Sequence, residues 1–184
     1  MAKIHKAFRQ KMLSTAKLQA GYQLIIYLAY QCYTSIIVKT PYIPYFTTSR
    51  YRVDTMVQLS EVTQIDRVAD LGTGDGRIAI AFAKEGAWVD AYELDGELIQ
   101  KAKSLIKKER LDDHIKMLKK DFWKADLSVY DIICIYPMPD IMQRLEEKLL
   151  KELKKGTRVL LNYYPFSNWK FEKTKNNIYL YVKQ

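Results

Sequence analysis

The stretch from residue 68 to residue 77, VADLGTGDGR, constrains the fold of this chain more than any other. A short apolar run carries Asp70 at its end, and Gly72, Gly74 and Gly76 follow at alternate positions before a helical pattern. Glycine adopts positive φ values without strain and lets other groups approach where a Cβ would stand. We therefore predict a strand, a tight turn and a helix, with a ligand pocket at the carboxyl edge of a parallel sheet.

Short apolar runs alternate with helical stretches over most of the chain. Strands are predicted at 67–71, 88–92, 115–118, 131–136, 158–163 and 177–182, and helices at about 54–62, 76–85, 96–109 and 140–154. This alternation indicates βαβ units, and the loss of helical patterns after Tyr163 predicts a closing antiparallel hairpin. The expected fold class is α/β: a Rossmann-like, seven-stranded, mostly parallel sheet with helices on both faces.

Charge is distributed unevenly along the chain. The 184 residues include 30 basic and 21 acidic side chains, which is a formal net charge of +9. Residues 1–53 hold eight of the basic side chains and no acidic one, so the remainder carries 22 basic and 21 acidic groups, a net of +1. Such a basic front end points to a membrane surface or a nucleic acid as its partner. We predict two parts: a basic, apolar N-terminal helical extension over 1–39 and a globular domain over 40–184.

Residues 18–38 form an apolar run of 21 positions without a charge. A helix of that length spans a bilayer of about 30 Å, but glutamines, hydroxyl residues and tyrosines dilute it. Three interpretations stay open: a membrane-spanning anchor, a helix packed on the body or on a partner protein, and a helix lying in the membrane interface. The five cations from Lys3 to Lys17 favour a cytoplasmic N-terminus, which argues against a single span with the domain inside. We expect a cytoplasmic protein whose residues 1–39 associate with the cytoplasmic face of the membrane or with a membrane protein.

The glycine turn indicates the kind of ligand. Its G-x-G-x-G spacing differs from the G-x-G-x-x-G of dinucleotide sites, and Asp75 inside it would repel a pyrophosphate. A cationic ligand such as S-adenosylmethionine, with a sulfonium and an amino group, suits that carboxylate; the alternative is that Asp75 shapes the loop. Glu93 closes the second strand, where a carboxylate can accept hydrogen bonds from a ribose diol. Asp121, next to Phe122 after the third strand, stands where an adenine can be held.

The predicted cofactor site therefore consists of Asp70, Gly72, Thr73, Gly74, Asp75, Gly76, Glu93, Asp121 and Phe122. No metal is expected, because His5 and His114 lack metal-ligand spacing and two cysteines cannot form a structural zinc site. Two cysteines also exclude a disulfide framework, which suits a reducing compartment.

These features resemble a class I S-adenosylmethionine-dependent methyltransferase. More narrowly, the chain resembles the small archaeal protein-lysine methyltransferases and the related family that acts on the c-subunit of mitochondrial ATP synthase. Residues 70–77 match that family's D-L-G-[ST]-G-D-G-R turn at every position, and 41–44 resemble its P-[FY]-[VI]-P segment. Residues 145–159 resemble its fifth helix and following strand, and Pro165 with Trp169 its closing Pro and Trp. The resemblance covers about residues 41–170.

The resemblance implies a methyl transfer from S-adenosylmethionine to an amine, namely a lysine side chain of a protein, which is a membrane protein if residues 1–39 bind the membrane. Tyr136, at the end of the fourth strand, is the candidate catalytic residue, lining a dry channel and orienting the amine; the alternative is an ordinary tyrosine on the core rim. Two departures from the family concern the acceptor side. Residues 45–48 read YFTT where relatives have Thr/Ser-Pro, and Tyr136 is followed by Pro137 where relatives have Leu.

Two other functions stay open. Residues 136–140, YPMPD, are partly similar to the [DN]-P-P-[FYW] loop of enzymes that methylate exocyclic amines of nucleic-acid bases, although Tyr136 replaces the required Asp or Asn. The basic front end supports that alternative. The other is a non-catalytic, membrane-tethered module that binds the methyl donor or nothing, against which the intact glycine and acidic positions argue. The sequence carries no indication of oligomeric state.

Overall fold

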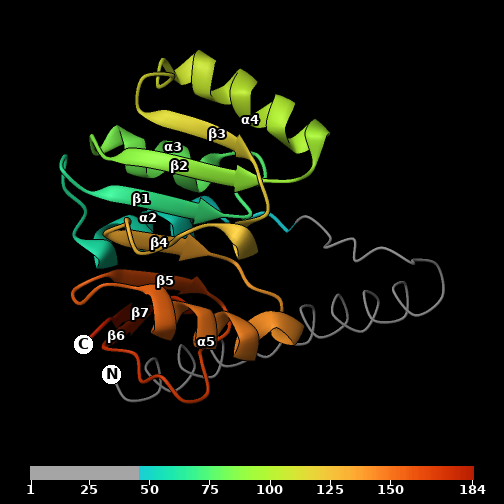
Figure 1. Ribbon diagram of the computed structural model, residues 1–184. Coiled ribbons are helices and arrows are strands. Elements are labelled where there is room, and N and C mark those ends of the chain that lie inside the picture. The colour runs from blue at the N-terminus through green and yellow to red at the C-terminus, as the bar shows by residue number, and fades with distance from the viewer. Residues whose placement is uncertain (1–45) are drawn as a thin grey trace, which may run out of the picture. The chain divides into compact units, whose positions relative to one another are not determined.

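A seven-stranded sheet organises the described part of the chain, residues 46–184 of a computed structural model (Figure 1). Its strands are β1 (Arg67–Leu71), β2 (Trp88–Glu93), β3 (Ile115–Lys119), β4 (Ile132–Ile135), β5 (Arg158–Asn162), β6 (Lys173–Lys175) and β7 (Ile178–Val182). In the strand order β3-β2-β1-β4-β5-β7-β6, neighbours from β3 to β5 run parallel, and the β5–β7 and β6–β7 pairs run antiparallel. The predicted α/β class, mostly parallel sheet and closing hairpin are confirmed.

The helices of this part of the chain are α2 (Arg50–Ser60), α3 (Arg77–Lys84), α4 (Gly96–Glu109) and α5 (Met142–Glu152), with short 3-10 helices η1 (Phe122–Lys124) and η2 (Pro139–Ile141). The predictions for α3, α4 and α5 agree within two residues. The helix predicted at 54–62 instead begins at Arg50. Ser49 has an extended backbone, with φ −63° and ψ 149°, so the helix begins directly after it.

Side chains of the central strands alternate between two hydrophobic cores, as expected for a sheet that is covered on both faces. In β4, Ile132 and Cys134 face the core formed with α2, α3 and α4, whereas Ile133 and Ile135 face the core formed with α5. All four side chains are buried, and burying each of the three isoleucines contributes about 1.5–3 kcal/mol. Figure 1 shows the helices on the two faces of the sheet, as predicted.

The buried carboxylate of Glu146 on α5 fixes the segment that follows β5. Its Oε1 accepts hydrogen bonds from the backbone N–H groups of Asn168, at 3.0 Å, and of Trp169. Trp169 in turn stacks on Phe166, with ring centroids 5.8 Å apart and planes at 6°. The Tyr181 hydroxyl accepts a hydrogen bond from the Phe166 N–H at 2.8 Å. These contacts close the core beneath α5 with the segment that carries the Pro and Trp of the sequence resemblance.

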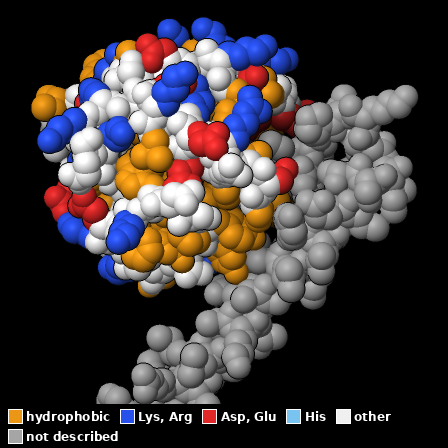
Figure 2. All heavy atoms as spheres, turned by 60° about the horizontal axis from the view of Figure 1, so that its bottom comes forward, with side chains coloured by type: hydrophobic (Ala, Val, Ile, Leu, Met, Phe, Trp, Pro, Cys, Tyr) orange, Lys and Arg blue, Asp and Glu red, His pale blue; other side chains and the backbone are white. Residues whose placement is uncertain are grey.

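Hydrophobic side chains also gather on the lower part of the face shown in Figure 2, with Lys and Arg side chains around them. The bottom of Figure 1, which comes forward in that view, carries α5, β6 and β7. Leu150 of α5 is 38% exposed, and Phe171, just before β6, is 44% exposed. Phe171 packs edge-on against Tyr179 with centroids 5.2 Å apart. Leu150 and Phe171 are therefore apolar side chains that remain partly exposed to solvent.

None of the helices within residues 46–184 is long and apolar enough to cross a bilayer. The N-terminal extension at 1–39, its apolar run at 18–38 and the segment 41–44 lie outside the described residues. Their interpretations stay predictions, as does the domain boundary between residues 39 and 40.

Candidate functional site

Parallel pairing brings the carboxyl ends of several strands to one edge of the sheet. Leu71 at the end of β1 pairs with Tyr92 of β2 on one side and with Ile135 of β4 on the other. The predicted site residues that end or follow these strands, namely the glycine turn, Glu93 and Tyr136, therefore lie at the same edge, at the arrowheads in Figure 1. A ligand of an open parallel sheet binds at this edge.

The turn after β1 is held by the neighbouring strand. The backbone N–H groups of Gly72 and Thr73 both donate to the carbonyl oxygen of Tyr92, at 3.0 and 2.9 Å. Gly72 has φ +76° and Gly76 has φ +82°, values that side chains with a Cβ rarely adopt. A Cβ at Gly76 would also lie 3.2 Å from the Cβ of Ala102 on α4. Glycine is thus required at position 76 by the backbone conformation and by close helix packing together.

Asp70 is buried beneath this turn, with 1% exposure. Its Oδ2 accepts hydrogen bonds from the Thr73 hydroxyl at 2.5 Å and from the Ala79 N–H at 3.2 Å. Burial raises the pKa of the Asp70 carboxyl to about 7, the negative charges of Glu93 and Asp75 act in the same direction, and the two hydrogen bonds oppose them. The side chain therefore joins the turn to the first turn of α3.

Glu93 reaches from the end of β2 toward the glycine turn. Its Oε2 accepts a hydrogen bond from the Gly74 N–H at 3.0 Å. Its Oε1 accepts from the N–H groups of Leu94 and Asp95, at 2.7 and 3.0 Å. Three backbone N–H groups thus fix the orientation of the Glu93 carboxylate, with Oε2 facing the glycine turn and Oε1 facing the segment after β2.

Asp75, inside the turn, forms ion pairs within the protein. The Nε and Nη2 of Arg77 lie 2.9 and 2.6 Å from its two carboxylate oxygens, and Lys101 Nζ of α4 lies 3.7 Å away. Only 5% of the Asp75 side chain is exposed. The Arg77 guanidinium also donates to the Thr48 carbonyl oxygen at 2.8 Å. The carboxylate therefore links the turn to α4 and to the segment before α2.

Asp121 and Phe122 lie just past β3, at the same edge. Asp121 Oδ1 accepts a hydrogen bond from the Trp123 N–H at 3.0 Å and so caps η1. The rings of Phe122 and Trp123 are 4.9 Å apart, and the Arg144 guanidinium of α5 lies 4.0 Å above the Trp123 ring. The structure thus places an aromatic pair beside the predicted adenine position.

Tyr136 follows β4, between the ends of β1 and β5. The register pairs Ile135 with Leu161 of β5, so the segment after β5 leaves the sheet beside Tyr136. Burial raises the pKa of the Tyr136 hydroxyl to about 12, and the neighbouring Tyr164 acts in the same direction, whereas the positive charge of Arg52 lowers it. A half-buried tyrosine cluster therefore occupies this side of the edge.

Five residues on this side of the edge are not among the predicted site residues. They are Thr48, Arg52, Asn162, Tyr163 and Tyr164. The Asn162 amide is buried and donates to the Thr48 hydroxyl at 2.9 Å, and the Arg52 guanidinium lies 5.1 Å from the Tyr163 ring centroid. The tyrosine pair lies at the end of the fifth predicted strand, 158–163, and could have been found from that position, but nothing in the sequence associates Thr48 or Arg52 with that strand.

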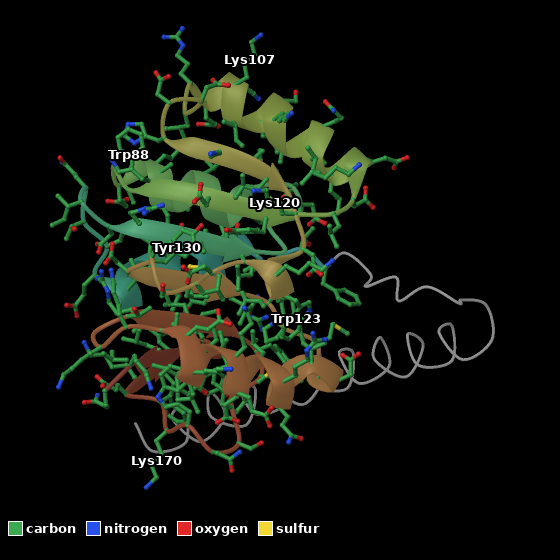
Figure 3. All side chains as sticks on the ribbon, viewed as in Figure 1. Trp88, Lys107, Lys120, Trp123, Tyr130 and Lys170 are labelled. Carbon is green, nitrogen blue, oxygen red and sulfur yellow. The ribbon has the colours of Figure 1, made fainter. Side chains whose placement is uncertain are left out.

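A hollow lies at the opposite edge of the sheet. It has a volume of about 680 Å³, and its lining includes Arg67, Trp88 and Ile115, which begin β1, β2 and β3. Figure 3 shows Trp88 and Tyr130 toward the starts of the strands and Trp123 toward their ends. This cavity is therefore separate from the edge that carries the predicted site.

Within residues 46–184, no group of three or more His, Cys, Asp or Glu side chains is arranged so that it could hold a metal ion.

Comparisons with known proteins point to one family. The family model described as the ANTKMT methyltransferase domain matches residues 70–173. The ATP synthase c-subunit lysine N-methyltransferase of Xenopus laevis is 36% identical over 129 residues, which cover 70% of this chain and 55% of that protein. A protein-lysine N-methyltransferase of Saccharolobus islandicus (strain REY15A) is 34% identical over 152 residues, which cover 77% of this chain and 94% of that protein. This chain therefore spans about half the length of the Xenopus relative.

A solved structure is similar over most of the described part. The RNA methyltransferase of Salinibacter ruber, in complex with S-adenosyl-L-homocysteine, has a TM-score of 0.71 and 30% sequence identity, and the match covers 74% of this chain and 93% of that one. Together with the sheet order, this similarity confirms the Rossmann-like methyltransferase fold.

The raised pKa of Asp70 predicts a pH dependence of stability. Its native value of about 7 lies above the ordinary 3.8, so the folded protein holds the proton more tightly than the unfolded chain. The resulting stability is complete below about pH 4 and is lost as the pH rises through about 7. The free energy of unfolding of the wild type, minus that of Asp70→Asn, should decrease by at most about 4 kcal/mol as the pH rises from 4 to 8. Urea denaturation at several pH values measures it; a constant difference contradicts the assignment.

The hydrogen bond between Thr48 and Asn162 predicts a stability difference between two adjacent threonines. Thr48→Ala removes the acceptor of a buried amide N–H, so the free energy of unfolding should fall by about 1–3 kcal/mol. Thr47 is exposed, and Thr47→Ala should change it by less than about 0.5 kcal/mol. Thr48→Ser retains the hydroxyl and should recover most of the loss. Equal effects of the two alanine substitutions in urea denaturation would show that the hydrogen bond contributes nothing.

Proposed function

The chain belongs to the ANTKMT methyltransferase family, and from that premise we propose that it transfers a methyl group from S-adenosylmethionine to a lysine side chain of a protein. The observation that carries this proposal is the position of Glu93, whose carboxylate extends from β2 to the Gly74 amide of the glycine turn. Support for the acceptor class comes from relatives whose names state lysine N-methylation.

S-adenosylmethionine fits the residues at this edge. An added Cβ at Gly72 would meet no atom within 4 Å, so there is open space beside the turn. Glu93 would accept hydrogen bonds from the ribose hydroxyls, while Asp121 and the Phe122 ring would hold the adenine. Bound there, S-adenosylmethionine supplies a methyl group on a positively charged sulfur, which an amine lone pair can attack.

In this proposal Asp70, Thr73 and Asp75 stabilise the conformation of the glycine turn. Asp70 and Thr73 hold its shape through their hydrogen bond. The ion pairs of Asp75 with Arg77 and Lys101 support the alternative in which Asp75 shapes the loop, because they compensate the charge that a sulfonium would otherwise meet. Asp75 would then serve the cofactor by positioning the turn.

Tyr136 would line the acceptor channel and orient the amine. A lysine attacks only as the neutral amine, and with an ordinary pKa of about 10.4 its deprotonation at pH 7 costs about 4.6 kcal/mol. A half-buried site walled by tyrosines lowers that cost, because it disfavours the charged ammonium. Holding the amine and the methyl group in line, about 3 Å apart, supplies much of the remaining rate enhancement.

A second candidate function is methylation of RNA. It is favoured by the similarity to the Salinibacter ruber RNA methyltransferase and by the basic residues at the front of the chain. Tyr136 argues against it, because enzymes that methylate base amines carry Asp or Asn at this position of the loop.

The lysine proposal has a finer form, in which the acceptor is a membrane protein. Residues 1–39 would then bring the enzyme to it at the cytoplasmic face of the membrane.

The proposed role of Glu93 predicts a loss of cofactor binding. Glu93→Ala removes the acceptor for the ribose hydroxyls, and Glu93→Gln weakens it while keeping the side-chain length. Each should reduce the affinity for S-adenosylmethionine by about 10- to 100-fold, in line with lost hydrogen bonds to a charged group. Isothermal titration calorimetry measures this. Glu97→Ala removes an exposed carboxylate four residues away and should bind normally; unchanged affinity in both Glu93 variants would rule out the assigned pocket.

Acceptor identity is tested by incubating cell membranes and cytosol separately with the protein and methyl-labelled S-adenosylmethionine. We expect label on a lysine of a protein, located by mass spectrometry of the modified peptides, and enriched in the membrane fraction if residues 1–39 bind membranes. Label confined to RNA or DNA would establish the second candidate. Cofactor binding without any transfer would favour a non-catalytic module.

A further inference from the structure

We propose that the Arg52 guanidinium, held against Asn162 and Tyr163 at the end of β5 and beside the end of β4 that leads into Tyr136, keeps the acceptor lysine in its neutral amine form. This inference rests on the proposed lysine methylation and adds the residue that controls the protonation state of the acceptor.

Arg52 is held in place by contacts with the end of β5. Its Nη1 lies 3.5 Å from Asn162 Oδ1, and its guanidinium carbon lies 5.1 Å from the centroid of the Tyr163 ring. Asn162 is itself fully buried and is oriented by its hydrogen bond to the Thr48 hydroxyl. The cation thus has a defined position at the acceptor side of the edge, on a helix that also packs on β5 and β7.

The charge of Arg52 acts on the place where the amine would stand. Tyr136 lies at the end of β4, beside the turn that follows β1. The groups that act on its hydroxyl include Tyr163 and Tyr164, from the segment after β5, and Arg52, from α2. Tyrosines are uncharged at neutral pH, so Arg52 contributes the charge among these three. It lowers the pKa of the Tyr136 hydroxyl, against the raising effect of burial.

The positive charge of Arg52 would also act on a lysine ammonium that stands next to Tyr136, and it would lower the pKa of that lysine as it lowers the pKa of Tyr136. A like charge nearby disfavours the ammonium, as burial does, so both effects lower the lysine pKa. The Tyr163 ring, which could otherwise attract an ammonium, already has Arg52 over it. Because an arginine does not lose its own proton at working pH, its repulsion persists over the whole range in which the lysine titrates.

The proposed sequence of events is balanced in protons and electrons. The lysine ammonium releases one proton to solvent as it enters the site. The nitrogen lone pair then forms the new N–C bond while the S–C bond of the donor breaks, and the electron pair of that bond stays on sulfur. The methylated ammonium that results is again positively charged, so repulsion by Arg52 also favours its departure.

The test is the pH dependence of kcat, which reports groups in the enzyme–substrate complex. The acceptor is a synthetic peptide that spans the modified lysine mapped in the labelling experiment. Arg52→Gln should move the acid limb of kcat upward by about one pH unit. The kcat should then fall about tenfold at pH 7.5 and return to the wild-type value above the limb. Arg52→Lys, which retains a positive charge, should keep the limb near its wild-type position.

Arg50→Gln is the matched control. Arg50 begins the same helix and is exposed, so its substitution removes one positive charge from α2 away from Tyr136 and should leave the profile unchanged. A loss of kcat in Arg52→Gln by the same factor at every pH would indicate a merely structural contact, and an unmoved profile would indicate no role. Either result overturns the inference.

Failure of the proposed function has a different outcome: the wild-type protein labels no lysine at any pH. Binding of S-adenosylmethionine by Arg52→Gln, measured by calorimetry, should equal that of the wild type. If this variant does not fold, Arg52→Met gives the same comparison, because it retains an unbranched apolar side chain over the Tyr163 ring.

Discussion

The candidate site depends on two hydrogen bonds that tie the turn after β1 to the neighbouring strand. Because Gly72 and Thr73 both donate to the Tyr92 carbonyl oxygen, the turn exists only while β1 and β2 keep their parallel register. The last pair in that register joins Leu71 to Tyr92, so the next residue of β2, Glu93, lies beside the turn and within reach of the Gly74 N–H. A slip of one residue would turn every side chain of β2 to the opposite face. It would also separate the carboxylate from the turn.

Buried carboxylates position several of the segments that flank the sheet. Glu146 holds the segment after β5, and Asp75 links the turn to α4 through Lys101. At the opposite edge of the sheet, Asp66 accepts hydrogen bonds from Thr63 and pairs with Arg158 at the start of β5. An ionised group taken out of water needs such partners to offset its lost hydration. Asp70 differs, because two hydrogen bonds do not compensate its complete burial and its pKa rises to about 7.

Local signals were sufficient for most of the fold. The strands around the glycine turn were predicted within about two residues because apolar runs, glycine spacing and helical periodicity agree there. The start of α2 was predicted four residues too late, at Asp54 in place of Arg50, because the residues before Asp54 carry no local signal that marks the start of a helix. On the acceptor side the sequence indicated Tyr136, Pro137 and residues 45–48, but it did not indicate Arg52, since Asn162 lies 110 positions from Arg52. No periodicity connects residues so far apart.

The sequence by itself determined the class of fold, the turn and the edge at which the site lies. Each of these follows from backbone sterics and from the period of apolar residues, which act over a few positions. Only the tertiary structure decided which charges meet: Asp75 with Arg77 and Lys101, and Arg52 with the tyrosines after β4 and β5. Electrostatic energies depend on the distance between groups and on their burial, and both quantities are set by how α2 and α4 pack against the sheet.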